Sequence, residues 1–312
     1  MRTIKRIAIF GERPQWHANR LRTALAARGA DGVCVSLGAC SIDTGAGAHG
    51  LDVPGFRGEL PDGALVRAIS AGSFEQVTLR LGLLHALHDL GVPVCNDARA
   101  IERCVDKSTT TFLLSRAGIA TPSTWVCESP EHARAVAARE IGAGRPLVLK
   151  PLFGAQGRGL HFLDDASRLP EPDEVAGVYY LQRYVDSGAG AFRDWRVFVV
   201  GGRAVAAMIR HGARCITTVG PGARWEGAAP DGEVGALAVA AADAVGAGFA
   251  GVDIIRDGAG RPQVLEVNSM PAWQGLQGVT RVDLAQEIAD DFLARLPTAD
   301  TAPVAARRAG AR

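Results

Sequence analysis

The chain has 312 residues, of which 47% are hydrophobic and 21% are charged, and its formal net charge at pH 7 is +1. This composition excludes intrinsic disorder over most of the chain and is typical of a globular protein whose core is divided over two or three lobes. The near-zero net charge argues against a dedicated nucleic-acid binder, because such proteins normally carry an excess of basic residues.

Targeting signals and cysteine patterns are absent from the sequence. The six cysteines form no C-x-x-C pair, so we expect reduced thiols and neither a disulfide framework nor a zinc site. The apolar run Ile7–Phe10 is too short for a signal peptide and is typical of a buried strand. No apolar run is long enough to span a membrane. A cytoplasmic protein without a membrane partner is therefore expected.

The N-terminal third alternates between apolar strands and amphipathic helices. Strands are predicted at Ile7–Phe10, Val33–Leu37, Ala64–Ile69 and Val92–Cys95, and helices at Gln15–Arg28 and Phe74–Leu90. Residues 38–63 are rich in Gly, Asp and Pro and are expected to be loop with at most one short strand. This alternation predicts a mostly parallel open α/β sheet covered by helices.

The sequence of the rest of the chain predicts a mixture of β-hairpins and helices. Helices are predicted at Ile101–Arg116, from Ser129-Pro130-Glu131 onward, at Glu233–Val245 and at Val282–Leu296. Strands are predicted at Leu147–Lys150, Tyr179–Val185, Asp194–Val200, Ala204–Arg210, Gly251–Arg256 and Gln263–Asn268. The low-complexity tail at residues 297–312 is expected to be disordered.

A glycine-rich loop follows a strand that ends in a lysine. Lys150 closes the apolar strand, and Gly154, Gly157 and Gly159 follow within nine residues. Glycines allow backbone N–H groups to approach phosphate oxygens, and a lysine supplies the compensating charge. The order of residues matches neither the Walker loop nor the Rossmann fingerprint. A phosphate-binding loop and a plain hairpin turn both fit this segment.

Three oxygen-bearing side chains occur on two strands that a turn near Gly258 could pair. Glu266 and Asn268 lie two residues apart and therefore share one face of their strand. Pairing of the two strands would place Asp253 beside them. Two carboxylates and an amide oxygen suit Mg²⁺, although the wet face of an antiparallel pair would show the same alternation.

Three arginines stand out from their surroundings. Arg196 and Arg210 flank a predicted hairpin at Gly201-Gly202, where two cations on adjacent strands repel each other unless a phosphate or carboxylate lies between them. A solvated basic face is the alternative. Arg67 interrupts an apolar strand, so it either projects into a cleft or marks an edge strand.

Taken together and in order, these segments resemble the RimK-type ATP-grasp ligases, the α-L-glutamate ligase family. The resemblance covers about residues 104–296. It rests on Asp106-Lys107, Pro122, Leu149-Lys150, Gly154–Gly159, Leu181–Val185, Asp194-Trp195-Arg196, Arg210, Asp253 and Glu266-Val267-Asn268. It implies an ATP-grasp fold with its small lobe at about residues 122–185, preceded by a pre-ATP-grasp α/β domain at residues 1–103. It also implies a ligase that forms an amide through an acyl phosphate and releases ADP and phosphate.

The resemblance assigns roles to individual residues. Contacts to ATP are implied for Lys107, Lys150, Gly154, Gln156, Gly157, Gly159, Gln182, Arg183, Tyr184 and Asp194. Lys150, Arg196 and Arg210 would act on the transferring phosphate, and Asp253, Glu266 and Asn268 would hold two Mg²⁺, or Mn²⁺, ions. Two departures from the family pattern are Arg183, where the hinge usually has a glutamate, and Arg214–Thr218, where the family has Arg-Ser-Asn.

The acceptor substrate is suggested by two short segments. Arg193–Arg196 and Glu266–Gln277 look most like the branch that adds L-glutamate to tetrahydromethanopterin-type coenzymes. Substrate contacts are then expected from Arg67, Arg214, Ser269 and Trp273. A ribosomal protein tail, a deazaflavin coenzyme or an amino-group carrier protein are alternative acceptors. A non-catalytic nucleotide-binding regulator is the alternative of another class. The resemblance also allows a homo-oligomer.

Overall fold

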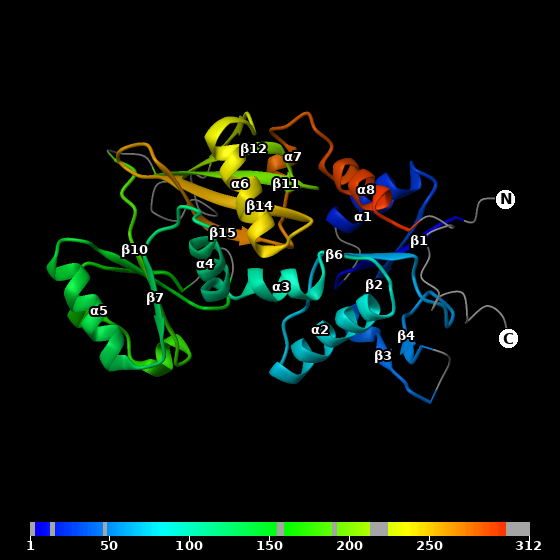
Figure 1. Ribbon diagram of the computed structural model, residues 1–312, viewed down its shortest axis with the longest axis horizontal. Coiled ribbons are helices and arrows are strands. Elements are labelled where there is room, and N and C mark those ends of the chain that lie inside the picture. Colours follow the sequence, from blue (N-terminus) through cyan, green and yellow to red (C-terminus); the bar gives the residue numbers. More distant parts are fainter. Residues whose placement is uncertain are drawn as a thin grey trace. The chain divides into compact units, whose positions relative to one another are not determined.

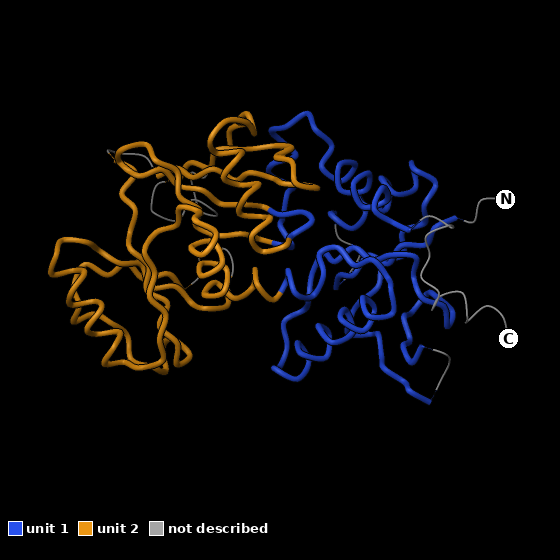
Figure 2. The backbone as a smooth tube through the Cα atoms, viewed as in Figure 1, with its two compact units in different colours: residues 1–101, 247–250, 269–312 blue, residues 102–246, 251–268 orange. Residues whose placement is uncertain are grey.

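The structure is a computed structural model that describes residues 4–12, 16–45, 49–154, 159–188, 192–212 and 224–297 (Figure 1). The chain forms two compact units (Figure 2). Unit 1 consists of residues 1–101, 247–250 and 269–312, and unit 2 of residues 102–246 and 251–268. Residues that follow position 268 thus cluster with the N-terminal residues, while the domain boundary at 103/104 stays a prediction.

Unit 1 is built on the parallel open sheet that the sequence predicts. Its strands are β1 (Arg6–Phe10), β2 (Asp31–Val35), β5 (Gly63–Val66) and β6 (Val94–Cys95), in the order β2-β1-β5-β6. Its helices are α1 (Trp16–Ala26), α2 (Phe74–Asp89), α7 (Gln274–Gln277) and α8 (Leu284–Ala294). All strand pairings in this sheet are parallel. A methyl group on Gly63 would lie 2.7 Å from the Phe292 ring, so α8 packs closely against β5.

The segment between β2 and β5 holds two short strands, so the expectation of at most one was wrong. β3 (Ser41–Ile42) and β4 (Leu51–Asp52) pair antiparallel with each other. A single-turn helix, Leu37–Ala39, precedes them. Two-residue strands carry too little alternation to be seen in a sequence, because their pairing partner supplies most of the signal.

The helix predicted at Ile101–Arg116 is divided into α3 (Ala98–Val105) and α4 (Lys107–Arg116). Asp106 is extended at the division, and its side chain accepts hydrogen bonds from the backbone N–H groups of Ser108 and Thr109. Such a cap satisfies donors at the start of a helix and competes with continuation of the preceding one. Lys107 is therefore the first residue of α4.

Unit 2 contains two antiparallel sheets. The smaller sheet has the order β7-β10-β8-β9 and consists of β7 (Thr124–Cys127), β8 (Leu147–Lys150), β9 (His161–Leu163) and β10 (Tyr179–Arg183), with helix α5 (Pro130–Gly142). Single-turn helices occur at Ala166–Arg168 and Pro172–Val175. The predicted cap Ser129 accepts the His132 N–H and starts α5. β7 and β9 are short and partly exposed, and the sequence pattern did not reveal them.

The larger sheet of unit 2 carries the predicted hairpins. Its order is β13-β12-β11-β14-β15, from β11 (Phe192–Val200), β12 (Arg203–Gly212), β13 (Arg224–Ala228), β14 (Phe249–Arg256) and β15 (Pro262–Asn268), with helix α6 (Gly232–Val245). Gly201 and Gly202 have positive φ angles of 55° and 73° at the turn between β11 and β12, as the glycine pair predicts. β13 is an exposed edge strand that was not predicted.

The cysteines at positions 34, 40, 95, 104 and 127 are free thiols, as expected, and Cys215 lies outside the described residues. Within the described ranges, no helix is long and apolar enough to cross a membrane. The tail expected to be disordered lies outside the described residues from position 298 onward.

A buried carboxylate on α5 gives a testable contribution to stability. Glu140 is 3% exposed and accepts hydrogen bonds from Arg145 Nε at 2.8 Å, Arg183 Nη2 at 2.7 Å and Arg139 Nε at 3.1 Å. Arg145 and the other two arginines lower the pKa of Glu140 from 4.5 to about 2. Their stabilisation is complete above pH 4.5 and is lost as the pH falls toward about 2.

We therefore expect Glu140→Gln to lower the midpoint of thermal unfolding at neutral pH and to weaken the dependence of that midpoint on acid. The reason is that the neutral amide leaves three guanidinium groups without their shared anion. Glu128 is an exposed carboxylate near the same helix, so Glu128→Gln serves as the control. It should leave the unfolding midpoint and its dependence on acid unchanged. Equal midpoints for Glu140→Gln and the wild type would contradict this prediction.

Candidate active site

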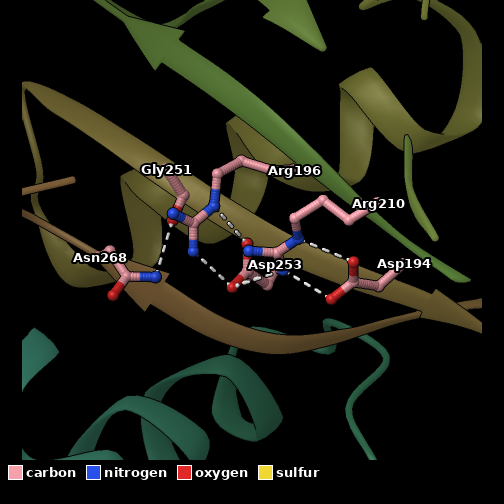
Figure 3. Close-up of polar contacts among 6 residues, drawn as sticks. All are labelled: Asp194, Arg196, Arg210, Gly251, Asp253 and Asn268. Carbon is pink, nitrogen blue, oxygen red and sulfur yellow. Dashed lines mark hydrogen bonds and ion pairs between the residues drawn. The ribbon is translucent and has the colours of Figure 1, made fainter. Parts of the chain in front are cut away.

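The two strands with oxygen-bearing side chains pair as the sequence predicts. β14 and β15 are antiparallel, and Asp253 lies directly opposite Glu266 in their register. Asn268 lies opposite Gly251, and its side-chain Nδ2 donates to the Gly251 carbonyl at 3.3 Å. The antiparallel pairing that follows the turn at Asp257-Gly258 thus brings Glu266 opposite Asp253 and Asn268 close by. Figure 3 shows Asp253 and Asn268.

Arg196 and Arg210 come from the neighbouring strands β11 and β12, with Asp253 between their guanidinium groups (Figure 3). Arg196 donates from Nε and Nη2 to the two oxygens of Asp253 at 2.7 and 2.6 Å. Arg210 donates in the same way to Asp194 at 2.8 and 2.5 Å, and its Nη2 lies 3.0 Å from Asp253 Oδ2. The anions predicted between these arginines are therefore carboxylates of the chain itself.

The two opposed carboxylates differ in their electrostatic environment. Burial alone would raise the pKa of Asp253, but Arg196 and Arg210 outweigh it and hold that pKa below the ordinary value. Burial, and then the charge of Asp253, raise the pKa of Glu266. Glu266 makes no hydrogen bond or ion pair with any described residue. Glu266 is therefore a partly desolvated carboxylate that lies beside the anionic Asp253 and makes no hydrogen bond to a described residue. Two neighbouring carboxylates of this kind favour a bound cation.

Lys150 is held at the end of β8 by a network of polar side chains. Its Nζ donates to Gln182 Oε1 at 2.6 Å, and Gln182 Nε2 donates to Thr124 Oγ1 at 3.0 Å. Gln182 Nε2 also donates to the Tyr180 hydroxyl at 3.3 Å, which lies 2.7 Å from Thr111 Oγ1 on α4. Burial lowers the pKa of Lys150 to about 8, against the opposing effect of Glu266.

The sequence reasoning missed Tyr180 and Thr111 as supports of this network. Tyr180 and Gln182 share one face of β10 by strand alternation, which is a usable signal. Thr111 comes from a helix far away in the chain, so only the folded structure shows its contact with Tyr180.

Lys107 and the glycine-rich loop lie together. The Lys107 Nζ donates to the carbonyl of Gly154 at 2.9 Å and approaches that of Leu152 at 3.4 Å. Burial lowers the pKa of Lys107, with Glu266 opposing this shift. Gly159 has a positive φ of 73°, which favours glycine. Gln156 and Gly157, like Arg214, lie outside the described residues, so their predicted contacts stay predictions.

The side chain of Arg183 points away from Lys150. Adjacent residues of a strand face opposite ways, so Gln182 reaches Lys150 while Arg183 donates to Glu140 on α5 at 2.7 Å. The backbone N–H of Tyr184 donates to Pro146, and its ring meets Phe162 edge-on at 5.1 Å. The arginine at this hinge position therefore pairs with the buried Glu140 of α5.

Three of the four residues expected at the substrate lie in unit 1. Arg67 and Trp273 are in contact, with the guanidinium 4.4 Å from the ring centroid. The backbone carbonyl of Ser269 accepts from Asn96 Nδ2 at 2.6 Å. β5 lies between β1 and β6, so the edge-strand explanation for Arg67 was wrong.

The donor set fits a divalent cation that is shared with another ligand. Within the described ranges, no cluster of three His, Cys, Asp or Glu side chains could hold a metal by itself. Asp253, Glu266 and Asn268 nevertheless present oxygen atoms, the ligands that Mg²⁺ prefers, and Mg²⁺ commonly completes its shell with phosphate oxygens and water. Lys107 and Lys150 supply the positive charge that phosphate groups require.

Comparison with solved structures identifies this fold as that of ATP-grasp ligases. The ATP-grasp ligase PsnB complexed with its minimal precursor matches with a TM-score of 0.72 and 23% identity, covering 94% of this chain and 99% of PsnB. A RimK domain ATP-grasp protein from Sphaerobacter thermophilus DSM 20745 matches with a TM-score of 0.66 and 26% identity, covering 92% of this chain and 99% of the other.

Sequence comparison identifies the family. Residues 104–292 match the RimK-like ATP-grasp domain. A tetrahydromethanopterin:alpha-L-glutamate ligase of Methanococcus maripaludis is 35% identical over 236 residues, which are 74% of this chain and 78% of the relative. A probable alpha-L-glutamate ligase 1 of Pseudoalteromonas atlantica is 32% identical over 300 residues, 91% of this chain and 93% of the relative. The chain belongs to the RimK-like ATP-grasp family and is an ATP-dependent ligase that forms carbon–nitrogen bonds.

The depressed pKa of Lys150 predicts opposite pH dependences for stability and for nucleotide binding. Folded Lys150 loses its proton near pH 8, whereas an unfolded lysine keeps it up to pH 10.5. The unfolded state therefore binds more protons between these values, and the free energy of unfolding rises with pH in that range. Affinity for ADP should fall over the same range because the cation is lost. Thermal unfolding measures the trend in stability, and calorimetric titration with ADP measures the trend in affinity. In Lys150→Met, both the stability and the ADP affinity should depend less on pH in this range.

Proposed function

We propose that the protein joins the amine of L-glutamate to a carboxylate of a tetrahydromethanopterin-type coenzyme. The observation that carries this proposal is the 35% identity, over 74% of the chain, to a ligase named for that pterin and for glutamate. A second relative of the same name, from Methanosarcina acetivorans, is 30% identical over 260 residues and supports the same acceptor. The proposal includes a cytoplasmic location and allows a homo-oligomer.

The reaction would proceed in two steps that the charged groups of unit 2 suit. A carboxylate oxygen of the acceptor bonds to the γ-phosphorus of ATP, and ADP leaves. The glutamate amine then attacks the acyl carbon, and inorganic phosphate leaves with the bridging oxygen. Lys150, Arg196 and Arg210 stabilise the negative charge on the transferring phosphoryl group. Neither step needs a covalent nucleophile from the protein.

We assign the remaining site residues to binding. Asp253, Glu266 and Asn268 hold Mg²⁺, as two ions for which Mn²⁺ can substitute, and this cation neutralises phosphate charge when it is bound. Lys107 and the loop from Gly154 to Gly159 contact the phosphates. Gln182, Arg183 and Tyr184 contact the adenine through the backbone, and Asp194 lies near the ribose.

A second candidate keeps L-glutamate and changes the acceptor. The relative from Pseudoalteromonas atlantica covers 91% of this chain, and its name specifies glutamate without an acceptor. A ribosomal protein tail, a deazaflavin coenzyme or an amino-group carrier protein would then receive the glutamate.

The test incubates the purified protein with ATP, Mg²⁺ and L-glutamate and adds one acceptor to each reaction. The acceptors are a tetrahydromethanopterin-type pterin, a deazaflavin coenzyme, an amino-group carrier protein and a ribosomal protein with a glutamate-rich tail. ADP release and a gain of one glutamyl residue on the pterin alone would support the proposal. Gain on another acceptor would replace the pterin with that acceptor, and ADP release without glutamyl transfer would refute the proposed substrate.

A further inference from the structure

Arg67 is a buried arginine in unit 1 whose hydrogen-bonding groups are mostly unused. It follows β5 directly, and its side chain is almost fully enclosed, with the residue 9% exposed. Its Nη2 donates to the Pro271 carbonyl at 2.8 Å, and its guanidinium lies 4.4 Å from the Trp273 ring centroid. The Nε and Nη1 atoms are buried and have no hydrogen-bond partner among the described residues.

No carboxylate of the described residues compensates the charge of Arg67. Burial lowers the pKa of Arg67 to about 9, and no acidic group counteracts this shift. Apart from Asp300 and the C-terminal carboxylate, all carboxylates of the chain belong to the described residues. A buried cation without an anion is costly, so folded proteins normally pair such a charge.

The surroundings of Arg67 are aromatic and neutral. His17 meets the Trp273 ring edge-on at 4.6 Å, and its Nε2 accepts the backbone N–H of Trp273 at 3.0 Å. Burial, and then the charge of Arg67, lower the pKa of His17 to about 4, so His17 is neutral at pH 7. The ring of Trp16 lies against His17 at 4.9 Å. None of these rings supplies the missing anion.

Arg20, a second arginine in unit 1, stacks on a tryptophan in the same way but has a carboxylate partner. Arg20 lies over the Trp16 ring at 5.8 Å, as Arg67 lies over Trp273. Arg20 Nη2, however, donates to Asp283 Oδ2 at 2.7 Å. The stacked arrangement is therefore shared by both arginines, and the absent carboxylate distinguishes Arg67.

We propose that Arg67, stacked on Trp273, anchors a subsite in unit 1 that takes a carboxylate group of one of the two substrates. The inference rests on the proposed function, in which both L-glutamate and the acceptor carry carboxylates. A planar guanidinium with unused N–H groups matches a planar carboxylate in geometry and charge. The carboxylate supplies the anion that the described residues do not.

Thermal unfolding in the absence of turnover tests the subsite directly. The wild type, Arg67→Met and Arg20→Met are titrated with sodium L-glutamate, sodium acetate and the pterin, with sodium chloride as the reference. A ligand that binds the folded state raises the unfolding midpoint. We expect a carboxylate-dependent rise for the wild type and for Arg20→Met, and its loss in Arg67→Met. The unliganded midpoint of Arg67→Met should equal or exceed that of the wild type, because an uncompensated buried charge has been removed.

Kinetics then distinguish the two sources of the carboxylate. Arg67→Met should raise KM by about tenfold to a hundredfold for the substrate whose carboxylate Arg67 binds, with a smaller effect on kcat. A rise for L-glutamate assigns the subsite to the amino acid, and a rise for the pterin assigns it to the acceptor. Arg67→Lys should recover part of the loss because it retains the charge without the planar geometry.

Three results would overturn the subsite. The first is that no carboxylate raises the unfolding midpoint of the wild type more than sodium chloride does. The second is that carboxylates raise the midpoint of Arg67→Met as much as that of the wild type. The third is that Arg67→Met has a lower unliganded midpoint than the wild type but binds carboxylates equally well. The last result would make Arg67 a structural residue. The midpoint measurements do not depend on turnover, so failure of the proposed function appears separately, as absence of glutamyl transfer by the wild type.

Discussion

Replacing Lys150 with methionine is expected to lower turnover by about two to three orders of magnitude. Lys150 is a partly buried cation at the end of β8 that Gln182, itself held by Tyr180, positions, and methionine keeps its length while removing the charge. ATP-dependent amide formation concentrates negative charge on the phosphoryl oxygens, and a fixed cation in a desolvated site stabilises that charge strongly. ADP release at saturating ATP, with glutamate and acceptor present, measures the effect.

The chain offers a matched control for Lys150→Met. Lys5, Lys107 and Lys150 are its only lysines. Lys5 lies in unit 1, where its Nζ donates to the Pro297 carbonyl at 2.8 Å. Lys5→Met should leave turnover unchanged, and Lys107→Met should weaken nucleotide binding. Turnover of Lys150→Met within about twofold of the wild type would contradict the assigned role of this lysine.

The strand pair with Asp253 and Glu266 could be predicted because its signals are local. A turn at Asp257-Gly258 between two apolar runs leaves one simple way for the strands to pair, and alternation fixes which side chains share a face. The hairpin at Gly201-Gly202 is specified in the same way. The pairing of Arg196 and Arg210 with an anion also followed, since two cations on adjacent strands need one.

What the sequence did not reveal depends on contacts between distant segments. The identity of the anions beside the two arginines required the register of β11, β12 and β14. The support of Lys150 from α4 through Thr111 and Tyr180 likewise joins segments that are far apart in the chain. The apolar spacing predicted one helix across Asp106 because it does not distinguish a capping residue from a helix interior. The resemblance, in which a lysine at position 107 opens a helix, indicated the start of α4 correctly.

The charges of the site would allow its arginines to serve the proposed reaction in addition to the stability of unit 2. In this structure Arg196 and Arg210 neutralise Asp253 and Asp194, while Glu266 stays uncommitted. A cation bound by Asp253 and Glu266 would take over part of the charge of Asp253. The guanidinium groups would then be available to a phosphoryl group at the same place. The arginines therefore contribute to the stability of unit 2 as well as to the proposed reaction.

Arg210→Met is expected to lower the free energy of unfolding of unit 2 by about 3–5 kcal/mol. Arg210 is 2% exposed and shares two hydrogen bonds with Asp194, which is itself 7% exposed. Burial would lower the pKa of Arg210, but Asp253 and Asp194 outweigh this effect and raise it, so the guanidinium is firmly charged. Methionine fills similar space but removes the Arg210 cation from the buried Asp194 carboxylate. Most of the free-energy cost of breaking a buried ion pair comes from a charge that stays buried after its partner is removed.

Urea unfolding followed by circular dichroism measures this loss, with Arg256→Met as the control. Arg256 pairs with Glu233 in unit 2 at 3.1 Å, but Glu233 is largely exposed, so removal of that pair should cost less than about 1 kcal/mol. Adding Asp194→Leu to Arg210→Met should recover much of the loss, because the buried carboxylate that has lost the Arg210 cation is then absent. A loss of the same size for Arg210→Met and Arg256→Met would show that the buried pair does not contribute as argued. A double variant no more stable than Arg210→Met would show that packing around Arg210, not the charge of Asp194, determines the cost.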